Sequence, residues 1–394
     1  MKPDPEFITA IYGPRRSGKT CLFYSVLKEN GYEDCLYLNF EDIDLLGFGP
    51  SELKDLLGHH LELFGRKPRI VLLDEVQEMK DWEKGLFSIY ESKEYSLMVT
   101  GSSAKLLSRE IATSLRGRAL KYLLLPLSFR EYLDFKDIEV RERRSSDDIT
   151  RLKRLLTSYL RDGSFPGLIG KEELIPRFYE EYIDLVVYRD LVERYGVQNL
   201  DLIKFLIRGV ISSYSKELSI NRLYNIWQSM GHSSTKRTMY QYFEYLQDAM
   251  FVHPLRKFSH SPRTSNLSIP KVYLTDTGAP SHLFGYQEGR AVENALFLEN
   301  LRRFEGMPSV EMFYWKDAGG ECDLVIRDGQ SIDRLVQCCY SLNRENYKRE
   351  ISGLQRAGRD LGCERLEIVS WTGEEKVPDD VSIIPLWKYL LDPY

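Results

Sequence analysis

The amino-acid sequence predicts an α/β fold divided into several domains. Short apolar segments alternate with segments of helical spacing over residues 1–128, and a second alternation of this kind occupies residues 279–394. Helical segments fill most of the chain between them. A chain of 394 residues also exceeds what one hydrophobic core organises, so two or three domains are expected.

The sequence GPRRSGKT at residues 13–20 stands between a predicted strand, residues 7–12, and a predicted helix. It matches GxxxxGK[ST], the glycine-rich loop whose backbone N–H groups surround phosphates at a helix N-terminus. Lys19 is expected to reach the β- and γ-phosphates of a nucleotide, and Thr20 to bind Mg²⁺. The predicted phosphate contacts comprise the loop and the start of the helix: Gly13, Pro14, Arg15, Arg16, Ser17, Gly18, Lys19, Thr20 and Cys21.

A second segment, RIVLLDEVQ at residues 69–77, is an apolar strand that ends in two carboxylates. Continuous apolar character is typical of a strand buried on both faces of a parallel sheet, which delivers functional groups at its carboxyl end. Asp74 is placed to hold Mg²⁺ through water, and Glu75 to orient or deprotonate the attacking water. The second acid favours hydrolysis over transfer to a bound substrate. A solvated acidic turn is the alternative.

Further strands are predicted at residues 35–42, 95–103 and 121–129, which completes a doubly wound parallel sheet. The strand at 95–103 ends in hydroxyl residues that are candidate sensors of the γ-phosphate: Thr100, Ser102 and Ser103. Hydroxyl residues at a strand end are also ordinary turn residues, so both interpretations stay open.

Two arginines flank a glycine before the last of these strands, Arg116 and Arg118. A guanidinium neutralises charge on a transferring phosphoryl group, from its own chain or from a neighbouring one. Arg118 is the stronger candidate for this role, and a basic surface turn is the alternative.

Residues 129–200 predict a helical lid, and residues 201–278 predict three helices followed by a hairpin, the order of a winged helix. Residues 232–271 hold six Lys or Arg against two acids, whereas the whole chain has a net charge of −5. This local excess predicts DNA contacts on the third helix and the hairpin, by Lys236, Arg237, Arg256 and Lys257. A docking surface for a protein partner is the alternative.

The last segment, residues 279–394, has the order helix, three strands, helix, strand of a restriction-nuclease-like core. Such a core brings a helix Glu, a strand Asp and an acid-x-Lys motif together around Mg²⁺. Glu293 and Asp323 match the first two, but Gln337 and Cys339 stand at the acid and lysine positions. Little or no cleavage activity is therefore expected, with Glu293 and Asp323 retained for binding or structure.

The remaining composition excludes several classes of protein. No apolar run approaches the roughly 18 residues of a membrane span, and no signal peptide opens the chain. The six cysteines form no CxxC pair and no zinc-binding spacing, which predicts reduced thiols in a cytoplasmic protein without a membrane partner.

Several stretches together resemble one prokaryotic family: GPRRSGKT, LLDEVQ, VTGSS with SLRGR, LPLSFREYL, YRDLVERYGV, KVYLTDTG, and ENALF with YW…GGECDLV. This family has an AAA-like P-loop ATPase core, a winged-helix segment and a C-terminal restriction-nuclease-like domain of unknown function. The resemblance covers nearly the whole chain and implies ATP as the nucleotide, a lid after the core, and action on DNA. It also implies the nucleotide, metal and arginine roles assigned above to Gly18, Lys19, Thr20, Asp74, Glu75 and Arg118.

Three functions are consistent with these patterns. The leading hypothesis is a Mg²⁺-dependent ATPase that couples its nucleotide state to binding or remodelling of DNA, including branched, single-stranded or duplex forms. The second is a nucleotide-dependent signalling switch that binds a protein partner. The third is an ATP-regulated, metal-dependent nuclease. A homo-oligomer is expected if Arg118 acts on a neighbouring chain.

Overall fold

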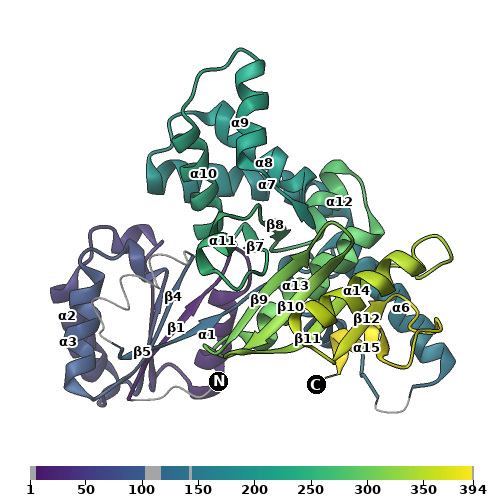
Figure 1. Ribbon diagram of the computed structural model, residues 1–394. Coiled ribbons are helices and arrows are strands. Elements are labelled where there is room, and N and C mark those ends of the chain that lie inside the picture. Colours follow the sequence, from purple (N-terminus) through teal and green to yellow (C-terminus); the bar gives the residue numbers. More distant parts are fainter. Residues whose placement is uncertain (1–5, 103–116, 142–143, 393–394) are drawn as a thin grey trace. The chain divides into compact units, whose positions relative to one another are not determined.

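The computed structural model describes residues 6–102, 117–141 and 144–392 (Figure 1). The chain divides into two compact units, Met1–Pro126 with Asp248–Met250, and Leu127–Gln247 with Phe251–Tyr394. The first boundary lies close to the predicted end of the first domain at residue 128. Among the described residues, no helix has the length and apolar character needed to cross a bilayer.

The first unit contains a parallel sheet of five strands in the order β2-β3-β4-β1-β5. The strands are β1 Ile8–Tyr12, β2 Cys35–Asn39, β3 Ile70–Asp74, β4 Ser96–Gly101 and β5 Ala119–Leu123. All five correspond to predicted strands. The last one ends six residues earlier than predicted, because Ser128 caps the next helix, α5 Phe129–Phe135, through a reciprocal pair of hydrogen bonds with Glu131.

Helices cover both faces of this sheet. The helices are α1 Lys19–Asn30, α2 Pro50–Phe64 and α3 Trp82–Ser92, with short 3₁₀ turns at Ile43–Leu45 and Val76–Glu78. Successive residues of a strand point to opposite faces. Ala10 of β1 accordingly packs in a core with Leu53 of α2 and Leu86 of α3, whereas the next residue, Ile11, packs in a core with Phe23 of α1. The predicted doubly wound arrangement is confirmed.

The second unit begins with helices and a small antiparallel sheet (Figure 1). The helices after α5 are α6 Ser146–Asp162, α7 Ile175–Leu185, a π-helix at Val186–Glu193, α8 Leu200–Ser212, α9 Ile220–Ser229, α10 Lys236–Asp248, α11 Pro262–Leu267 and α12 Gly278–Phe284, with 3₁₀ turns at Pro166–Leu168 and Glu172–Leu174. The three strands are β6 Lys216–Glu217, β7 Val252–Leu255 and β8 Lys271–Leu274, in the order β6-β8-β7. The π-helix continues α7, so the two form one long helical segment with a wider final section.

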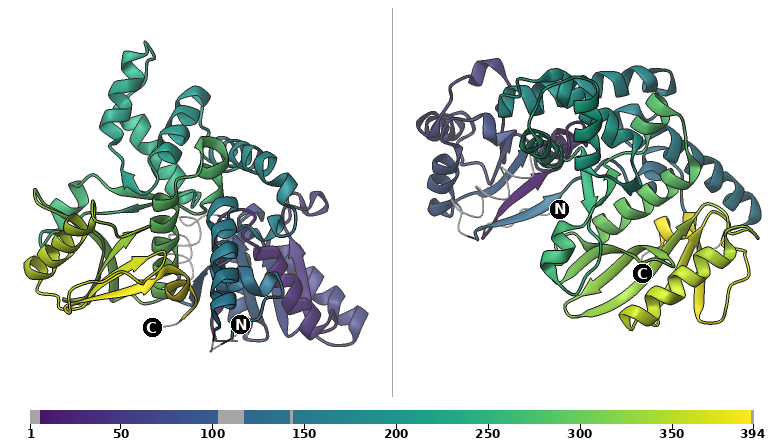
Figure 2. Two further views of the ribbon diagram at one scale, coloured as in Figure 1. Left: turned by 90° about the vertical axis from the view of Figure 1, so that its right-hand side faces the viewer. Right: turned by 45° about the horizontal axis from the view of Figure 1, so that its top comes forward.

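A second five-stranded sheet occupies the C-terminal part, in the order β13-β12-β11-β10-β9 (Figure 2). Its elements are α13 Glu288–Phe304, β9 Val310–Lys316, β10 Glu321–Asp328, β11 Ser331–Cys339, α14 Tyr347–Leu361, β12 Leu366–Ser370, β13 Val381–Pro385 and α15 Leu386–Leu391. The first three strands pair antiparallel, and β11, β12 and β13 pair parallel. The element order agrees with the predicted one up to β12; β13 and α15 were not expected.

A buried carboxylate joins three segments of the second unit. Asp276 accepts hydrogen bonds from the Tyr179 hydroxyl at 2.5 Å, from the Ser164 backbone N–H at 2.6 Å and from the Gly278 backbone N–H at 2.7 Å. Burial raises the pKa of Asp276 although these donors oppose the shift. The carboxylate therefore fixes the turn before α12 against α7.

We predict that Gly278→Ala destabilises the protein by about 1–3 kcal/mol, because the added methyl group has no space. A Cβ at Gly278 would lie 2.1 Å from the hydroxyl oxygen of Tyr179, a residue with no exposed surface. Gly289→Ala is the matched control, since a Cβ there meets no atom within 4 Å. Its effect is expected to stay within about 0.5 kcal/mol in a denaturant titration. Equal midpoints for the two variants would contradict this account.

Candidate functional site

The glycine-rich loop lies between β1 and α1, at the carboxyl edge of the first sheet. We call residues 13–20 the P-loop. Gly18 has a φ of 103°, a left-handed conformation that glycine adopts at no steric cost. Gly13 is equally constrained, because a Cβ there would lie 2.0 Å from the carbonyl oxygen of Leu124. Both glycines of the motif are thus required by the path of the backbone.

Lys19 folds back over this loop and is 5% exposed. Its ammonium donates hydrogen bonds to the carbonyl oxygens of Gly13 at 3.1 Å and Pro14 at 3.2 Å. It also forms an ion pair with Glu75 Oε1 at 3.4 Å. Three acceptors at more than 3 Å hold the charge without a short bond, so an anion at the P-loop can replace them.

Asp74 ends β3 and is fully buried. Its Oδ1 accepts a hydrogen bond from the Thr100 hydroxyl, and its Oδ2 accepts one from the Tyr37 hydroxyl at 3.2 Å. The Thr100 oxygen in turn accepts from the Glu75 backbone N–H at 2.9 Å. Hydroxyls from β2 and β4 therefore orient the carboxylate that was predicted to hold Mg²⁺.

Glu75 has a φ of 49°, which is costly for a residue other than glycine and is typical of functional positions. Burial opposes its ionisation, but Lys19, the Gln77 amide at 2.7 Å, Arg15 and Ser102 together lower its pKa. The side chain is therefore an anion at neutral pH, buried beside the P-loop. This is the state that a general base for water requires.

The residues of the loop fit a phosphate group. Among the described residues, the Ser17 hydroxyl oxygen is buried without a hydrogen-bond partner. The N-cap of α1 is Gly18, which provides no side-chain cap. Unsatisfied donors at a helix N-terminus attract anions. Thr20 follows Lys19 in the first turn of α1, as a metal-binding hydroxyl must.

The other predicted phosphate contacts differ in how far their side chains are exposed. Arg15 is half-buried and forms an ion pair with Glu41 at 2.8 Å. Arg16 and Cys21 are exposed. Their roles in nucleotide binding stay predictions.

The two described sensor candidates both contact the acids at the end of β3. Thr100 donates its hydroxyl proton to Asp74. Ser102 is fully buried, and its hydrogen bond lowers the pKa of Glu75. A role of either hydroxyl toward the γ-phosphate stays a prediction. Ser103 and Arg116 lie outside the described residues.

Arg118 lies at the wrong edge of the sheet to act within its own chain. Ile8 pairs with Ala119 in parallel register, so Arg118 precedes β5 at the amino edge, whereas the P-loop follows the carboxyl end of β1. The guanidinium forms an ion pair with Glu91 at 2.9 Å. This position disfavours a contact to a nucleotide on the same chain, and the role of Arg118 in hydrolysis stays a prediction.

The predicted DNA contacts fall in two places of the second unit. Lys236 and Arg237 are exposed in the first turn of α10. Arg256 lies in a groove with Tyr240 of α10 and donates to the Asn266 carbonyl at 2.6 Å. The backbone of Lys257 forms a bridge to Tyr314 of β9. Arg256 and Lys257 are half-buried, so this pair is less exposed than Lys236 and Arg237.

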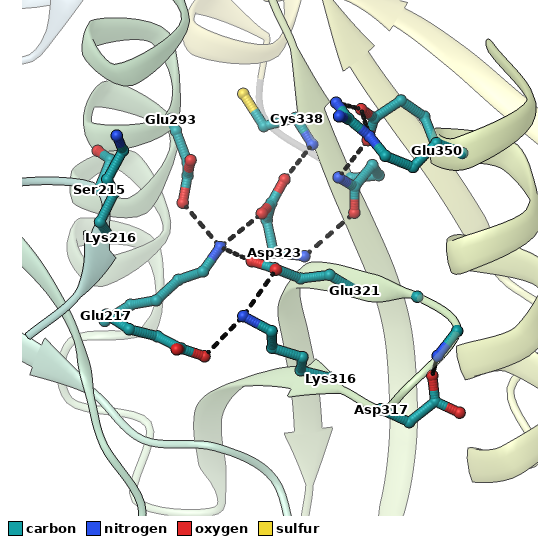
Figure 3. Close-up of a pocket in the computed structure, with 15 residues that line it drawn as sticks. Ser215, Lys216, Glu217, Glu293, Lys316, Asp317, Glu321, Asp323, Cys338 and Glu350 are labelled. Atoms are coloured by element: carbon teal, nitrogen blue, oxygen red, sulfur yellow. Dashed lines mark hydrogen bonds and ion pairs between the residues drawn. The ribbon is translucent and has the colours of Figure 1, made fainter. Parts of the chain in front are cut away.

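A polar pocket of about 720 Å³ lies in the C-terminal part of the second unit. Glu293 of α13 and Asp323 of β10 both face it, as Figure 3 shows together with Glu321. Gln337 of β11 also lines it, and its amide oxygen accepts from the Asp323 backbone N–H at 3.2 Å. The three residues predicted to share a nuclease-like centre are therefore brought together.

The pocket also contains a residue that sequence reasoning missed, Lys271 of β8. It is 4% exposed, and its ammonium forms ion pairs with Glu293, Glu321 and Asp323. These carboxylates raise the pKa of Lys271 against the opposing effect of burial. No local pattern predicts this position, because the lysine lies 52 residues before Asp323.

Comparisons with known proteins identify the first domain and the family of the chain. Residues 5–133 match the family model described as an AAA domain, and residues 153–289 match a domain of unknown function, DUF8612. An uncharacterized protein of Methanocaldococcus jannaschii, MJ1544, is 35% identical over 99% of this chain and 90% of its own. The chain belongs to the same family as MJ1544. The family match indicates an AAA-type ATPase and supports nucleotide binding and hydrolysis.

Other similar proteins are more distant. An uncharacterized protein of Haemophilus influenzae is 26% identical over 76% of each chain. The AMPPCP-bound structure of DnaA from Aquifex aeolicus is 15% identical, with a TM-score of 0.25 over 62% of this chain and 82% of that chain. A DNA polymerase III gamma subunit-related protein of Thermotoga maritima is 15% identical, with a TM-score of 0.27 over 62% of this chain and 95% of that chain.

We predict a pH dependence of stability that originates at Glu293. Burial, the largest cause, raises the pKa of Glu293 from 4.5 to about 7. The folded protein therefore holds this proton more tightly than the unfolded chain does, and the stabilisation is complete below pH 4.5 and is lost as the pH rises through 7. Glu293→Gln removes this titration, so the difference in Tm between wild type and variant should change across this window.

The matched control is Glu364→Gln, which removes an exposed carboxylate from the same unit. Its Tm should follow that of the wild type at every pH. A constant difference between Glu293→Gln and wild type across the window would contradict the prediction.

Proposed function

We propose that the protein binds ATP with Mg²⁺ at the P-loop and hydrolyses it, and that its nucleotide state controls DNA binding by the second unit. The contact that carries the proposal is the 3.4 Å ion pair between Lys19 and Glu75, beside the fully buried Asp74. A P-loop lysine, a metal-holding acid and an adjacent catalytic acid thus meet at one edge of the sheet. The match to an AAA domain supports this assignment.

In this mechanism Lys19 exchanges its carbonyl partners for the β- and γ-phosphates. The carbonyl oxygens of Gly13 and Pro14 lose a hydrogen bond, and the phosphates gain a charge-assisted one. Ser17 would donate its hydroxyl proton to a phosphate oxygen. Thr20 and Asp74 would hold Mg²⁺, which supplies charge neutralisation between the β- and γ-phosphates.

The same exchange activates Glu75. While Lys19 is close, it lowers the pKa of Glu75 and weakens it as a base. Departure of the ammonium toward the phosphates removes that stabilisation, so the affinity of Glu75 for a proton rises once the nucleotide is bound. Gln77, whose amide donates to Glu75 at 2.7 Å, holds the carboxylate in place meanwhile. Glu75 then accepts the proton of the attacking water.

DNA binding is proposed from the order of elements and the charges in the second unit. Three helices, α8 to α10, precede the antiparallel pair β7 and β8, whose connection contains α11. The strand β6 joins the same sheet, and three helices followed by antiparallel strands is the order of a winged helix. Lys236 and Arg237 extend from the N-terminus of α10, where positive charge and the helix dipole both favour phosphate. This supports contact with the DNA backbone.

A protein partner is the second candidate, favoured by exposed apolar side chains on the same helices. Ile226, Met230 and Tyr240 are 41%, 57% and 40% exposed. Apolar side chains of this kind belong to protein interfaces more than to phosphate contacts. Binding of DNA forms therefore separates the two candidates.

We predict that Lys19→Ala abolishes ATP turnover, because it removes the ammonium that lies on the P-loop carbonyl oxygens and is placed to contact the phosphates. Glu75→Gln is expected to reduce kcat by roughly 10²–10⁴-fold while retaining nucleotide binding, since it removes only the proton acceptor. Phosphate release assays and nucleotide binding assays on both variants test this. Lys28→Ala, an exposed lysine of the last turn of α1, is the control and should keep wild-type turnover. Full activity of Lys19→Ala would refute the assignment.

We predict that the double variant Lys236→Ala, Arg237→Ala weakens binding of every DNA form and lowers the slope of log K against log salt by about two. The control removes the same charge from exposed positions of α14, through Lys348→Ala and Arg359→Ala. Fluorescence anisotropy with duplex, single-stranded and branched DNA at several salt concentrations measures both. Unchanged DNA affinity in the first variant, or no DNA binding by wild type, would favour the protein-partner candidate.

A further inference from the structure

Lys271 is held by carboxylates from two other elements. Its ammonium lies 2.7 Å from Asp323 Oδ1 and 2.5 Å from Glu321 Oε1, both on β10. It lies 3.2 Å from Glu293 Oε1 on α13. Figure 3 shows these three carboxylates pointing toward a common centre. A single positive charge therefore occupies the middle of a ring of oxygen atoms.

The oxygens of this ring have further hydrogen-bond donors of their own. Glu293 Oε1 also accepts from the Tyr273 hydroxyl at 2.7 Å. Asp323 Oδ2 accepts from the Cys338 backbone N–H at 3.0 Å. Glu321 Oε2 forms a second ion pair with Lys316 at 3.5 Å. The acceptors that a nuclease-like core uses for Mg²⁺ are thus engaged by protons of the protein.

Gln337, which stands at the acid position of the expected motif, also forms hydrogen bonds within the protein. Gln337 accepts from the Asp323 backbone N–H through its oxygen, and its nitrogen donates to Glu350 Oε2 at 2.7 Å. Glu350 also forms an ion pair with Arg349 at 2.5 Å. Gln337 therefore links Asp323 to α14 and offers no charge to a metal.

A divalent cation does not fit this arrangement. An ion bound to Asp323 Oδ1 and Glu293 Oε1 would have to displace the ammonium from these oxygens. An ion on the other oxygen of either carboxylate would lie close to the ammonium, and the two positive charges would repel each other. Among the described residues, no group of three or more His, Cys, Asp or Glu side chains is arranged to hold a metal ion.

We propose that the ammonium of Lys271 replaces the divalent cation of a nuclease-like centre, so that this centre is complete without a metal. The cation comes from β8, so the ion pairs fasten the three-stranded sheet β6-β8-β7 to α13 and to the C-terminal sheet. The ion pairs in this pocket therefore hold the structure together. Without a metal ion, the pocket cannot generate a metal-bound hydroxide for cleavage. This role is independent of the nucleotide site.

The proposal predicts that removal of the Lys271 charge creates a cation site. Lys271→Met keeps an unbranched side chain of similar length but leaves three carboxylates facing one another. Mn²⁺ is the probe, titrated without nucleotide into the full chain carrying Asp74→Asn, so that the first site does not contribute. We expect one Mn²⁺ per chain for Lys271→Met, bound at least roughly tenfold more tightly than by the parent protein, with a Kd on the order of 10⁻⁴ M.

Two further variants locate the ion. Adding Asp323→Asn to Lys271→Met should abolish the new binding. Lys316→Met is the matched control, because it removes a cation from the same pocket but leaves Lys271 in place, and it should gain no Mn²⁺ site. If Lys271→Met is too unstable for titration, a rise of its Tm with Mn²⁺, absent for the parent and for Lys316→Met, supports the proposal.

Two results would overturn the proposal. One is stoichiometric Mn²⁺ binding by the parent protein that is lost on Asp323→Asn, because the centre would then hold a metal beside its lysine. The other is a folded Lys271→Met variant with neither Mn²⁺ binding nor a Mn²⁺-dependent Tm. Metal-dependent DNA cleavage by the wild-type protein that requires Asp323 would overturn the proposal for the same reason as the first result.

Discussion

The ion pair between Lys19 and Glu75 joins the loop after β1 to the end of β3, and the chemistry assigned to the first unit depends on it. Both side chains are buried, so each stabilises the charge of the other while no nucleotide is bound, with Arg15 adding a second positive charge near Glu75. Leaving one member of a buried pair unpaired costs about 3–5 kcal/mol. When a phosphate takes Lys19 as its partner, the buried Glu75 anion loses the stabilisation that the ammonium gave it. Its affinity for a proton of the attacking water therefore rises.

The second unit contains another buried lysine with the opposite character. Lys19 is held by two carbonyl oxygens and one carboxylate, all at 3.1 Å or more. Lys271 is held by three carboxylates, two of them at 2.7 Å or less. The weaker set of partners permits an exchange with an incoming anion, whereas the stronger set keeps the ammonium in place. Lys19 is therefore suited to exchange its partners when a nucleotide binds, whereas Lys271 is suited to a fixed structural role.

Much of the first unit was predictable because its signals are local. A strand, a glycine loop and a helix follow one another within residues 7–30, and Asp74 and Glu75 directly follow an apolar strand. The position of Arg118 was also readable in principle. A residue that precedes a parallel strand lies at the opposite edge of the sheet from a loop that follows one, and this rule places Arg118 at the edge away from its own chain's P-loop.

Contacts between distant segments were not predictable in this way. Lys271 contacts Glu293 and Asp323, which lie 22 and 52 residues further along the chain. At such separations the spacing of residues in the sequence does not predict which side chains come into contact. The acid-x-Lys motif predicts a lysine at the position of Cys339, whereas the lysine that contacts Asp323 in the structure is Lys271 of β8. Thr100 illustrates a subtler limit, because a hydroxyl at a strand end has the same sequence pattern whether it faces a phosphate or a neighbouring carboxylate. Only the packing of β4 against β3 distinguishes the two.

Calorimetric titration of the purified, folded chain with ATP and Mg²⁺ tests the central assignment most directly. The account predicts saturable binding of one nucleotide per chain, weakened when Mg²⁺ is withheld, because Thr20 and Asp74 then lose the ion that they share with the phosphates. Absence of binding heat for both ATP and ADP at millimolar concentration would contradict it.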